Sequence, residues 1–211
     1  MKQSNNSIDK FLSIIPGGLF GLLSCAIVLF CDFISIFLFH KEYSFLNNMI
    51  SELGRGSYGF VFSMGLIISG IISVPYYLAL GRTFNDDTVN KKLKKLAIII
   101  SLISIITFVF VGIFPSLEEN YIIYFTHGTF AFISLATGMI YLIVFSYLML
   151  KDEKYSKIQA YHGFIVAGAY IIFLFTWIPI IEWIITFGLI SWISRNSVFM
   201  IHKKIPKLEL L

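Results

Sequence analysis

Apolar residues run along this chain in six long blocks that short polar segments separate. Each block is roughly 18 to 30 residues long, enough for a helix to cross about 30 Å of bilayer hydrocarbon. An amphipathic helix of a soluble protein would instead place apolar residues at every third or fourth position. The pattern predicts six membrane-spanning helices, at about residues 12–39, 58–80, 96–115, 121–150, 159–180 and 182–200.

The composition leads to the same fold class, an all-α polytopic membrane bundle. Hydrophobic residues make up 57% of the chain and charged residues only 13%, against about 25% charged residues in soluble domains. Because the six blocks leave no room for a separate soluble domain, residues 1–211 are predicted to form a single transmembrane domain. Cys25 and Cys31 face different sides of one helix, which excludes a disulfide framework or a zinc site built from them.

The basic residues predict how the bundle is oriented. The six spans place fourteen of the sixteen lysines and arginines on one side of the membrane, and the other two are Lys41 and Arg55. An excess of Lys and Arg marks the cytoplasmic loops of membrane proteins. Both termini and segments 82–95 and 151–157 are therefore predicted to be cytoplasmic, with segments 40–57 and 116–120 outside the cell membrane.

The net charge of +4 does not indicate nucleic acid as a partner. The basic residues lie beside helix ends, where each gains about 1 kcal/mol from anionic lipid. The expected partners are membrane lipids, with anionic headgroups at the cytoplasmic loops, and the sequence identifies no protein partner.

Small and polar residues mark the helix faces that look inward, because helix association in lipid depends on close packing and on paired polar groups. On the first span they recur at helical spacing as Gly18, Gly21, Cys25, Asp32 and Ser35. Comparable faces on the second, third and fourth spans carry Gly70, Ser73 and Tyr77, then Ser101 and Ser104, then His127, Ala131, Ser134, Gly138 and Tyr141. The predicted packing positions are Gly18, Gly21, Gly70 and Gly138, and these four faces are expected to pack together.

Asp32 is the strongest candidate for a functional residue, because placing a carboxylate in a span costs roughly 2.5–3.5 kcal/mol at the bilayer centre. At a rise of about 1.5 Å per residue, Asp32 lies about 9 Å, and His127 about 12 Å, on the outer side of the midpoint of its own span. A contact between Asp32 and His127 is therefore expected, and the outer loop could bring Glu52 to the same place.

Three interpretations of Asp32, Glu52 and His127 are open at this point. The first is a buried hydrogen-bonded pair that fixes helix register. The second is a binding site for a small molecule or a lipid headgroup, and the third is acid–base catalysis, with or without a divalent metal. The chain contains no HExxH or GxSxG motif and no cluster of Cys and His, so no metal site and no cofactor is predicted.

Several short motifs add a resemblance to a known family. They are Ser51-Glu52-Leu53-Gly54, Met64-Gly65-Leu66-Ile67-Ile68-Ser69-Gly70 and Val111-Gly112-Ile113-Phe114-Pro115. Together with Asp32 and His127, they resemble the six-span prokaryotic membrane family called domain of unknown function nine-nine-eight (DUF998), over residues 12–180. The layout is also similar to that of eukaryotic relatives of the damage-regulated autophagy modulators. The resemblance implies a prokaryotic cell membrane and no established reaction, and it puts at motif positions Asp32, Glu52, Gly54, Gly112, Pro115 and His127.

The preferred hypothesis is a multi-pass membrane protein with an outer-side site for a small molecule or a lipid headgroup at Asp32, Glu52 and His127. One alternative is an intramembrane enzyme acting on a lipid or a lipid-linked substrate, and another is a structural or assembly partner without a ligand. A cavity that holds Asp32 and His127 and opens to lipid or water would favour a ligand site or an enzyme. A sealed pair would favour a structural role.

The orientation can be tested with a cysteine at Glu118, in a variant whose Cys25 and Cys31 are replaced by serine. Because Glu118 falls in a predicted outside turn, Glu118→Cys should react with a membrane-impermeant maleimide in intact cells. The matched variant Lys154→Cys, in a predicted cytoplasmic segment, should react only after permeabilisation. The opposite order of labelling would overturn the orientation.

Overall fold

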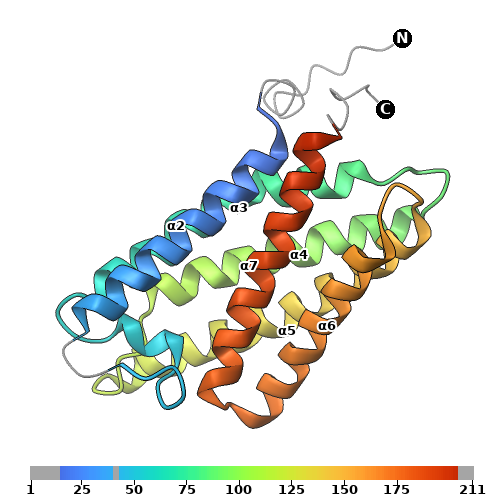
Figure 1. Cartoon of the computed structure of the whole chain (residues 1–211). Helices are drawn as coiled ribbons and strands as arrows, with labels where there is room; N and C mark the ends of the chain where they lie inside the picture. Colours follow the sequence, from blue (N-terminus) through green and yellow to red (C-terminus); the bar gives the residue numbers. More distant parts are fainter. Residues whose placement is uncertain (1–14, 40–42, 204–211) are drawn as a thin grey trace.

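The computed structural model describes residues 15–39 and 43–203, which form an all-helical structure without strands (Figure 1). Six of the helices in this part of the chain are long and apolar enough to cross a membrane, which confirms the six-span, all-α prediction. The elements in chain order are α2 (Gly17–Leu38), the 3-10 helix η1 (Ile50–Gly54), α3 (Gly59–Thr83), α4 (Lys91–Ile113), α5 (Tyr121–Lys151), α6 (Lys157–Thr176) and α7 (Pro179–His202).

Capping groups move some helix ends away from the predicted span limits. α4 begins at Lys91 rather than near residue 96, because the Asn90 side chain accepts hydrogen bonds from the N–H groups of Lys92 and Leu93. Hydropathy identifies the apolar part of a span, whereas a cap allows the helix to continue into the polar flank. The predicted start of the first span, at residue 12, lies outside the described residues.

The last span is one uninterrupted helix. α7 runs for 24 residues and passes through Arg195 to His202, so it extends beyond the predicted limits of 182 and 200 at both ends. Its first residue is Pro179, and the fixed φ of proline suits the first position of a helix. This earlier start places Glu182 inside the helix rather than at its boundary.

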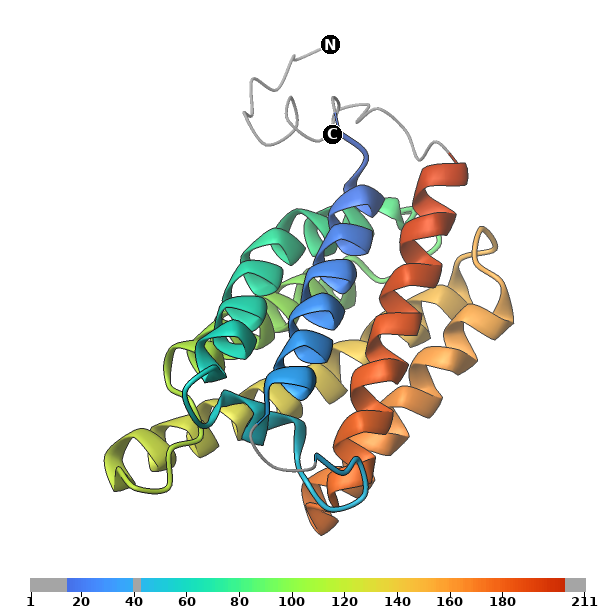
Figure 2. The same ribbon diagram turned by 60° about the vertical axis from the view of Figure 1, so that its left-hand side comes forward.

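The six long helices form a ring in chain order. Each helix packs against the next one, from α2 to α7, and α7 packs back against α2. Figures 1 and 2 show α2 and α7 beside each other. We call the two ends of the bundle the Glu118 end, which holds η1 and the α4–α5 turn, and the Lys91 end, which holds the α3–α4 and α5–α6 turns.

The ring corrects one expectation from the sequence. The inward faces of the first four spans do not all pack against one another, since α2 and α5 lie on opposite sides of the ring and α6 and α7 complete it. The faces instead surround a shared interior. Helical spacing identifies which face of a helix is turned inward, but it carries no information about which helix that face meets.

Large side chains fill the interior in the Lys91 half of the ring. Tyr76, Phe145 and Trp192, from α3, α5 and α7, are fully buried there. A polar contact joins α6 to α7, because the Gln159 amide of α6 donates a 3.3 Å hydrogen bond to Asn196 of α7. This half therefore has a closed core that holds the ring together.

Glycines allow neighbouring helices to approach closely. A Cβ atom at Gly18 or Gly21 of α2 would collide with Ser197 of α7. At Gly70 of α3 it would lie 2.6 Å from a side chain of α4, and at Gly138 of α5 it would lie 3.1 Å from a ring of α6. All four glycines assigned to packing from the sequence thus lie where two helices touch.

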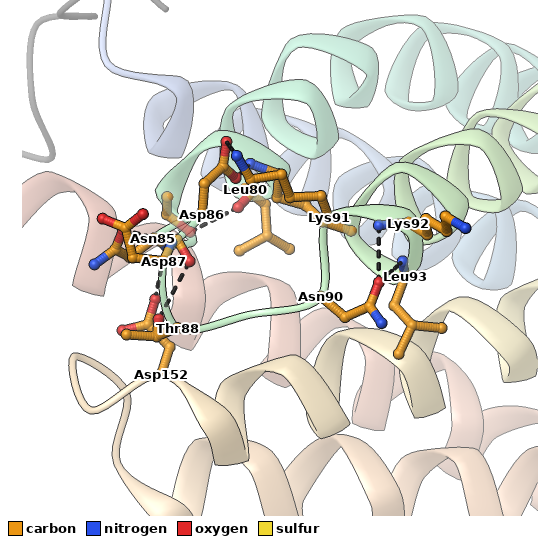
Figure 3. Close-up of polar contacts among 12 residues, drawn as sticks. Leu80, Asn85, Asp86, Asp87, Thr88, Asn90, Lys91, Lys92, Leu93 and Asp152 are labelled. Atoms are coloured by element: carbon orange, nitrogen blue, oxygen red, sulfur yellow. Dashed lines mark hydrogen bonds and ion pairs between the residues drawn. The ribbon is translucent and has the colours of Figure 1, made fainter.

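A buried carboxylate joins two turns at the Lys91 end (Figure 3). Asp152, between α5 and α6, is only 3% exposed and accepts hydrogen bonds from the backbone N–H of Asn85 at 3.0 Å and of Lys154 at 3.1 Å. The Lys154 ammonium in turn donates to the carbonyl of Thr83 at the end of α3, at 2.7 Å. These bonds fix the α5–α6 turn against the α3–α4 turn.

Replacing Asp152 by alanine should destabilise the protein, because the backbone N–H groups of Asn85 and Lys154 would lose their partly buried hydrogen-bond acceptor. The expected loss is about 1–3 kcal/mol of unfolding free energy, measured as a lower midpoint of thermal unfolding in detergent. Asp87→Ala is the control, since it removes the same charge from an exposed position of the same end. Equal midpoints for the two variants would show that the Asp152 contacts do not stabilise the bundle.

Candidate functional site

A cavity of about 880 Å³ lies inside the Glu118 half of the ring, and all six long helices contribute to its wall. This volume falls within the roughly 300–1,000 Å³ of typical small-molecule sites. Much of the wall is apolar, and the ionisable or charged side chains on it other than tyrosine and cysteine are Asp32, Arg55, His127 and Glu182. Asp32 and His127 thus belong to one cavity rather than to a sealed pair.

The cavity opens sideways between α5 and α6. Tyr121, Phe125 and Phe132 of α5 and Trp177 at the end of α6 line it and are also exposed at the surface of the bundle. Figures 1 and 2 both show α5 and α6 diverging toward the Glu118 end. Because these lining side chains are exposed on the outside of apolar helices, the cavity reaches the outer surface of the bundle on this side.

Asp32 lies on the cavity wall with no compensating group beside it in the described part of the chain. Asp32 is only 1% exposed, and neither of its carboxylate oxygens has a hydrogen-bond partner among the described residues. Burial of a carboxylate is unfavourable unless a hydrogen bond, a proton or a cation offsets the charge. Glu182 of the adjacent α7, a group of the same charge sign, acts electrostatically on Asp32.

His127 faces the same cavity from α5, but its hydrogen bond goes elsewhere. Its Nδ1 lies 2.7 Å from the carbonyl oxygen of Phe114, the residue that follows α4. A carbonyl only accepts, so Nδ1 carries the proton and donates. Neither Asp32 oxygen has a hydrogen-bond partner among the described residues, so the contact expected between Asp32 and His127 is not made as a hydrogen bond. The two residues lie on helices at opposite sides of the ring.

Glu182 reaches the cavity although the sequence analysis did not select it. Its carboxylate accepts a 2.8 Å hydrogen bond from the backbone N–H of Ile50, the first residue of η1. The sequence analysis placed residue 182 at the first position of the sixth predicted span. Pro179 is the sequence signal that indicates an earlier helix start. A helix that begins at Pro179 contains Glu182 within its first turn.

A second bond joins the same loop to α7. The Trp183 indole donates to the hydroxyl of Tyr43 at 3.0 Å, and that hydroxyl donates to the carbonyl of Met49 at 2.9 Å. Burial raises the pKa of the Tyr43 phenol, so Tyr43 stays protonated and keeps this donor. The loop before α3 is thereby held over the Glu118 end of the cavity.

Glu52 stabilises this loop instead of facing the cavity. Its carboxylate accepts hydrogen bonds from the Asn48 amide at 2.9 Å and from the backbone N–H of Met49 at 3.4 Å. The neighbouring Ile50 and Ser51 line the cavity, whereas Glu52 does not. The structure thus brings Asp32 and His127 to one site and leaves Glu52 outside it.

Arg55 lies at the rim and is already paired. Its Nε donates to the carbonyl of Ser116 at 2.9 Å, and its Nη2 forms an ion pair with Glu118 at 2.8 Å. These contacts tie the end of the loop to the α4–α5 turn. The guanidinium of Arg55 is thereby paired with residues of the α4–α5 turn.

The comparison with protein families identifies the chain. Residues 22–202 match the model of a family described as protein of unknown function (DUF998). The chain belongs to the DUF998 family. No match was found among curated proteins or among solved structures, so the similarity of layout to the damage-regulated autophagy modulators remains an expectation.

The family description names no activity, and the six long apolar helices of this DUF998 protein support a multi-pass membrane protein. Two of the motif positions quoted from the sequence meet beside the cavity rather than on it. A Cβ atom at Gly54 would lie 3.5 Å from the Cβ of Pro115, which brings the end of η1 against the end of the third span. These positions hold the loop to the bundle. Among the described residues of this DUF998 chain, no three Cys, His, Asp or Glu side chains come together as a metal site would require.

Loss of the Glu182 carboxylate should release the loop from α7. In Glu182→Ala, hydrogen exchange at the Ile50 amide should accelerate by about tenfold or more, because a hydrogen bond to a charged acceptor is worth about 1.5–3 kcal/mol. Glu182→Gln keeps an acceptor oxygen and should retain most of the protection. Glu119→Ala, an exposed acid at the same end, is the control, and equal exchange in all three variants would contradict the proposed attachment.

Proposed function

We propose that this DUF998 protein binds a lipid-like amphipathic molecule whose headgroup lies at the Glu118 end of the cavity and whose apolar part lies between α5 and α6. The observation that supports the proposal most is the combination found in one cavity. A buried carboxylate at Asp32 and an apolar wall share a space whose lining includes exposed side chains of α5 and the end of α6. Such a space suits a ligand that is polar at one end and apolar at the other.

The proposed orientation follows from the basic residues. We place the Glu118 end outside a prokaryotic cell membrane and both termini in the cytoplasm, as the positive-inside rule predicts. A ligand would then enter from the outer leaflet without crossing the bilayer. The site is accordingly proposed for the outer side of the membrane.

At the Lys91 end we propose contacts with anionic lipid headgroups. The hydrogen bond from Lys94 lowers the pKa of Asp86, and Lys91 lies 3.9 Å from the same carboxylate. Lys92 and Lys95 are exposed on the first turns of α4. These two ammonium groups are placed to meet lipid phosphates.

Catalysis receives less support than binding. An acid–base pair requires two groups within hydrogen-bond reach of a shared substrate. His127 donates from Nδ1 to Phe114, and Asp32 lies on a helix across the ring from it. A purely structural role is also less favoured, because Asp32 does not serve as a hydrogen-bonded link between helices in the described residues.

The binding proposal can be tested with two glycine variants that differ only in position. A Cβ atom at Gly128 of α5 or at Gly168 of α6 would meet no atom within 4 Å, but only Gly128 lines the cavity. Gly128→Trp should fill the opening and lower the amount of lipid retained through purification by about tenfold or more, equivalent to about 1.4 kcal/mol or more. Native mass spectrometry of the detergent-extracted protein measures this amount.

Gly168→Trp should retain lipid as the unmodified protein does, because its indole projects away from the cavity. Both substitutions replace a helical glycine, so they share any change in helix propensity. Equal retention by the two variants, or no retained lipid in the unmodified protein, would overturn the binding proposal.

A further inference from the structure

The polar part of the ligand can be specified further from the charges around Asp32, on the basis of the proposed function. We propose that the headgroup is a protonated amine, whose N–H groups donate to the carboxylate of Asp32 while Glu182 contributes a second negative charge. The same chemistry occurs in an aminophospholipid headgroup and in a free long-chain amine.

The first argument is that Asp32 needs a donor. The carboxylate is buried to 1% exposure, lines the cavity and has no hydrogen-bond partner in the described ranges. An ionised carboxylate can accept several hydrogen bonds, and charge-assisted bonds from an ammonium are shorter and stronger than neutral ones. A donor that carries positive charge satisfies both the oxygens and the charge.

The second argument is the sign of the surrounding charge. Glu182, on the adjacent α7, also lines the cavity and interacts electrostatically with Asp32. Two carboxylates in one apolar space disfavour each other's ionised form unless a proton or a cation joins them, and a bound ammonium group supplies that cation. Arg55 does not neutralise them, because its guanidinium is bound to Ser116 and Glu118 at the rim.

The surroundings favour an organic amine over a metal ion. Calcium takes about six to eight oxygen ligands and magnesium about six, whereas in the described residues no three acidic, His or Cys side chains gather at one point. An ammonium needs fewer protein oxygens. Side chains such as Val28, Leu66 and Phe108 form an apolar wall. This wall can pack against the hydrocarbon attached to an amine, but it offers no hydrogen bonds to a hydrated ion.

The experiment measures headgroup preference in the full-length protein. Detergent-extracted protein is incubated with equal amounts of phosphatidylethanolamine, phosphatidylcholine and phosphatidylglycerol of identical acyl chains, and bound lipids are counted by native mass spectrometry. Phosphatidylethanolamine should exceed phosphatidylglycerol by about tenfold or more, because only the former donates charged N–H groups to a carboxylate. Phosphatidylcholine, which is positive at nitrogen but has no N–H group, should fall between the two.

Asp32→Asn should abolish this preference, because an amide has no negative charge to attract the ammonium. Glu119→Gln removes a negative charge from an exposed position of the same end and should leave the preference unchanged. If Asp32→Asn does not fold, Glu182→Gln serves as the second variant, with a preference reduced by a few fold. An unchanged preference in Asp32→Asn would overturn the proposal.

A competition experiment distinguishes the two sources of the amine. Dodecylamine and dodecanol differ only in the terminal group, and only the amine should displace bound phosphatidylethanolamine. If dodecylamine binds but phosphatidylethanolamine does not, the ligand is a free amine rather than a phospholipid.

The experiments separate a failure of the amine assignment from a failure of the binding proposal. Lipid binding that Gly128→Trp removes, but that shows no preference for an amine, overturns the amine assignment and leaves the binding proposal standing. Absence of any retained lipid or amine overturns both.

Discussion

Six helices arranged in a ring must fill the axis of that ring with side chains, and this protein does so more completely in the Lys91 half than in the Glu118 half. Toward the Lys91 end, aromatic residues such as Tyr76, Phe145 and Trp192 occupy the interior completely. Toward the Glu118 end, α5 and α6 diverge (Figure 2), and the side chains that face inward leave a space of about 880 Å³. The larger buried cluster lies in the Lys91 half, and a smaller one around Leu53, Phe62 and Trp183 packs beside the cavity, so close packing on either side of it supports the hollow.

The loop before α3 belongs to the cavity as much as the helices do. It is attached to α7 through Glu182 and Trp183 and to the α4–α5 turn through Arg55. Opposite walls of the cavity are thus connected across its Glu118 end by one short segment. Opening the cavity at the Glu118 end requires that a few polar bonds of this loop break. At the side, the width of the opening depends on the separation of α5 and α6.

Much of this arrangement could be predicted from the sequence, because the bilayer imposes strong rules on composition and spacing. The length of the apolar blocks identified all six helices, and the spacing of Gly18, Gly21, Cys25, Asp32 and Ser35 identified the face of α2 that is buried. Depth also placed Asp32 and His127 in one cavity. The contact expected between them is not made as a hydrogen bond, because depth along a helix does not determine its neighbours around a ring. Glu182 was missed since its position depends on a helix start that Pro179, rather than hydropathy, determines.

Closure of the ring joins the first described helix to the last. The thiol of Cys25 lies 3.8 Å from the carbonyl oxygen of Ile190, a contact between residues 165 positions apart. Contacts of such long sequence separation form late, because the entropy of closing the intervening chain must be overcome first. During biogenesis, α2 therefore enters the membrane with Asp32 on a face that α7 will cover only after the rest of the chain has been synthesised. Until α7 is in place, the ring stays open on the side of α2 that carries Gly18, Gly21 and Asp32.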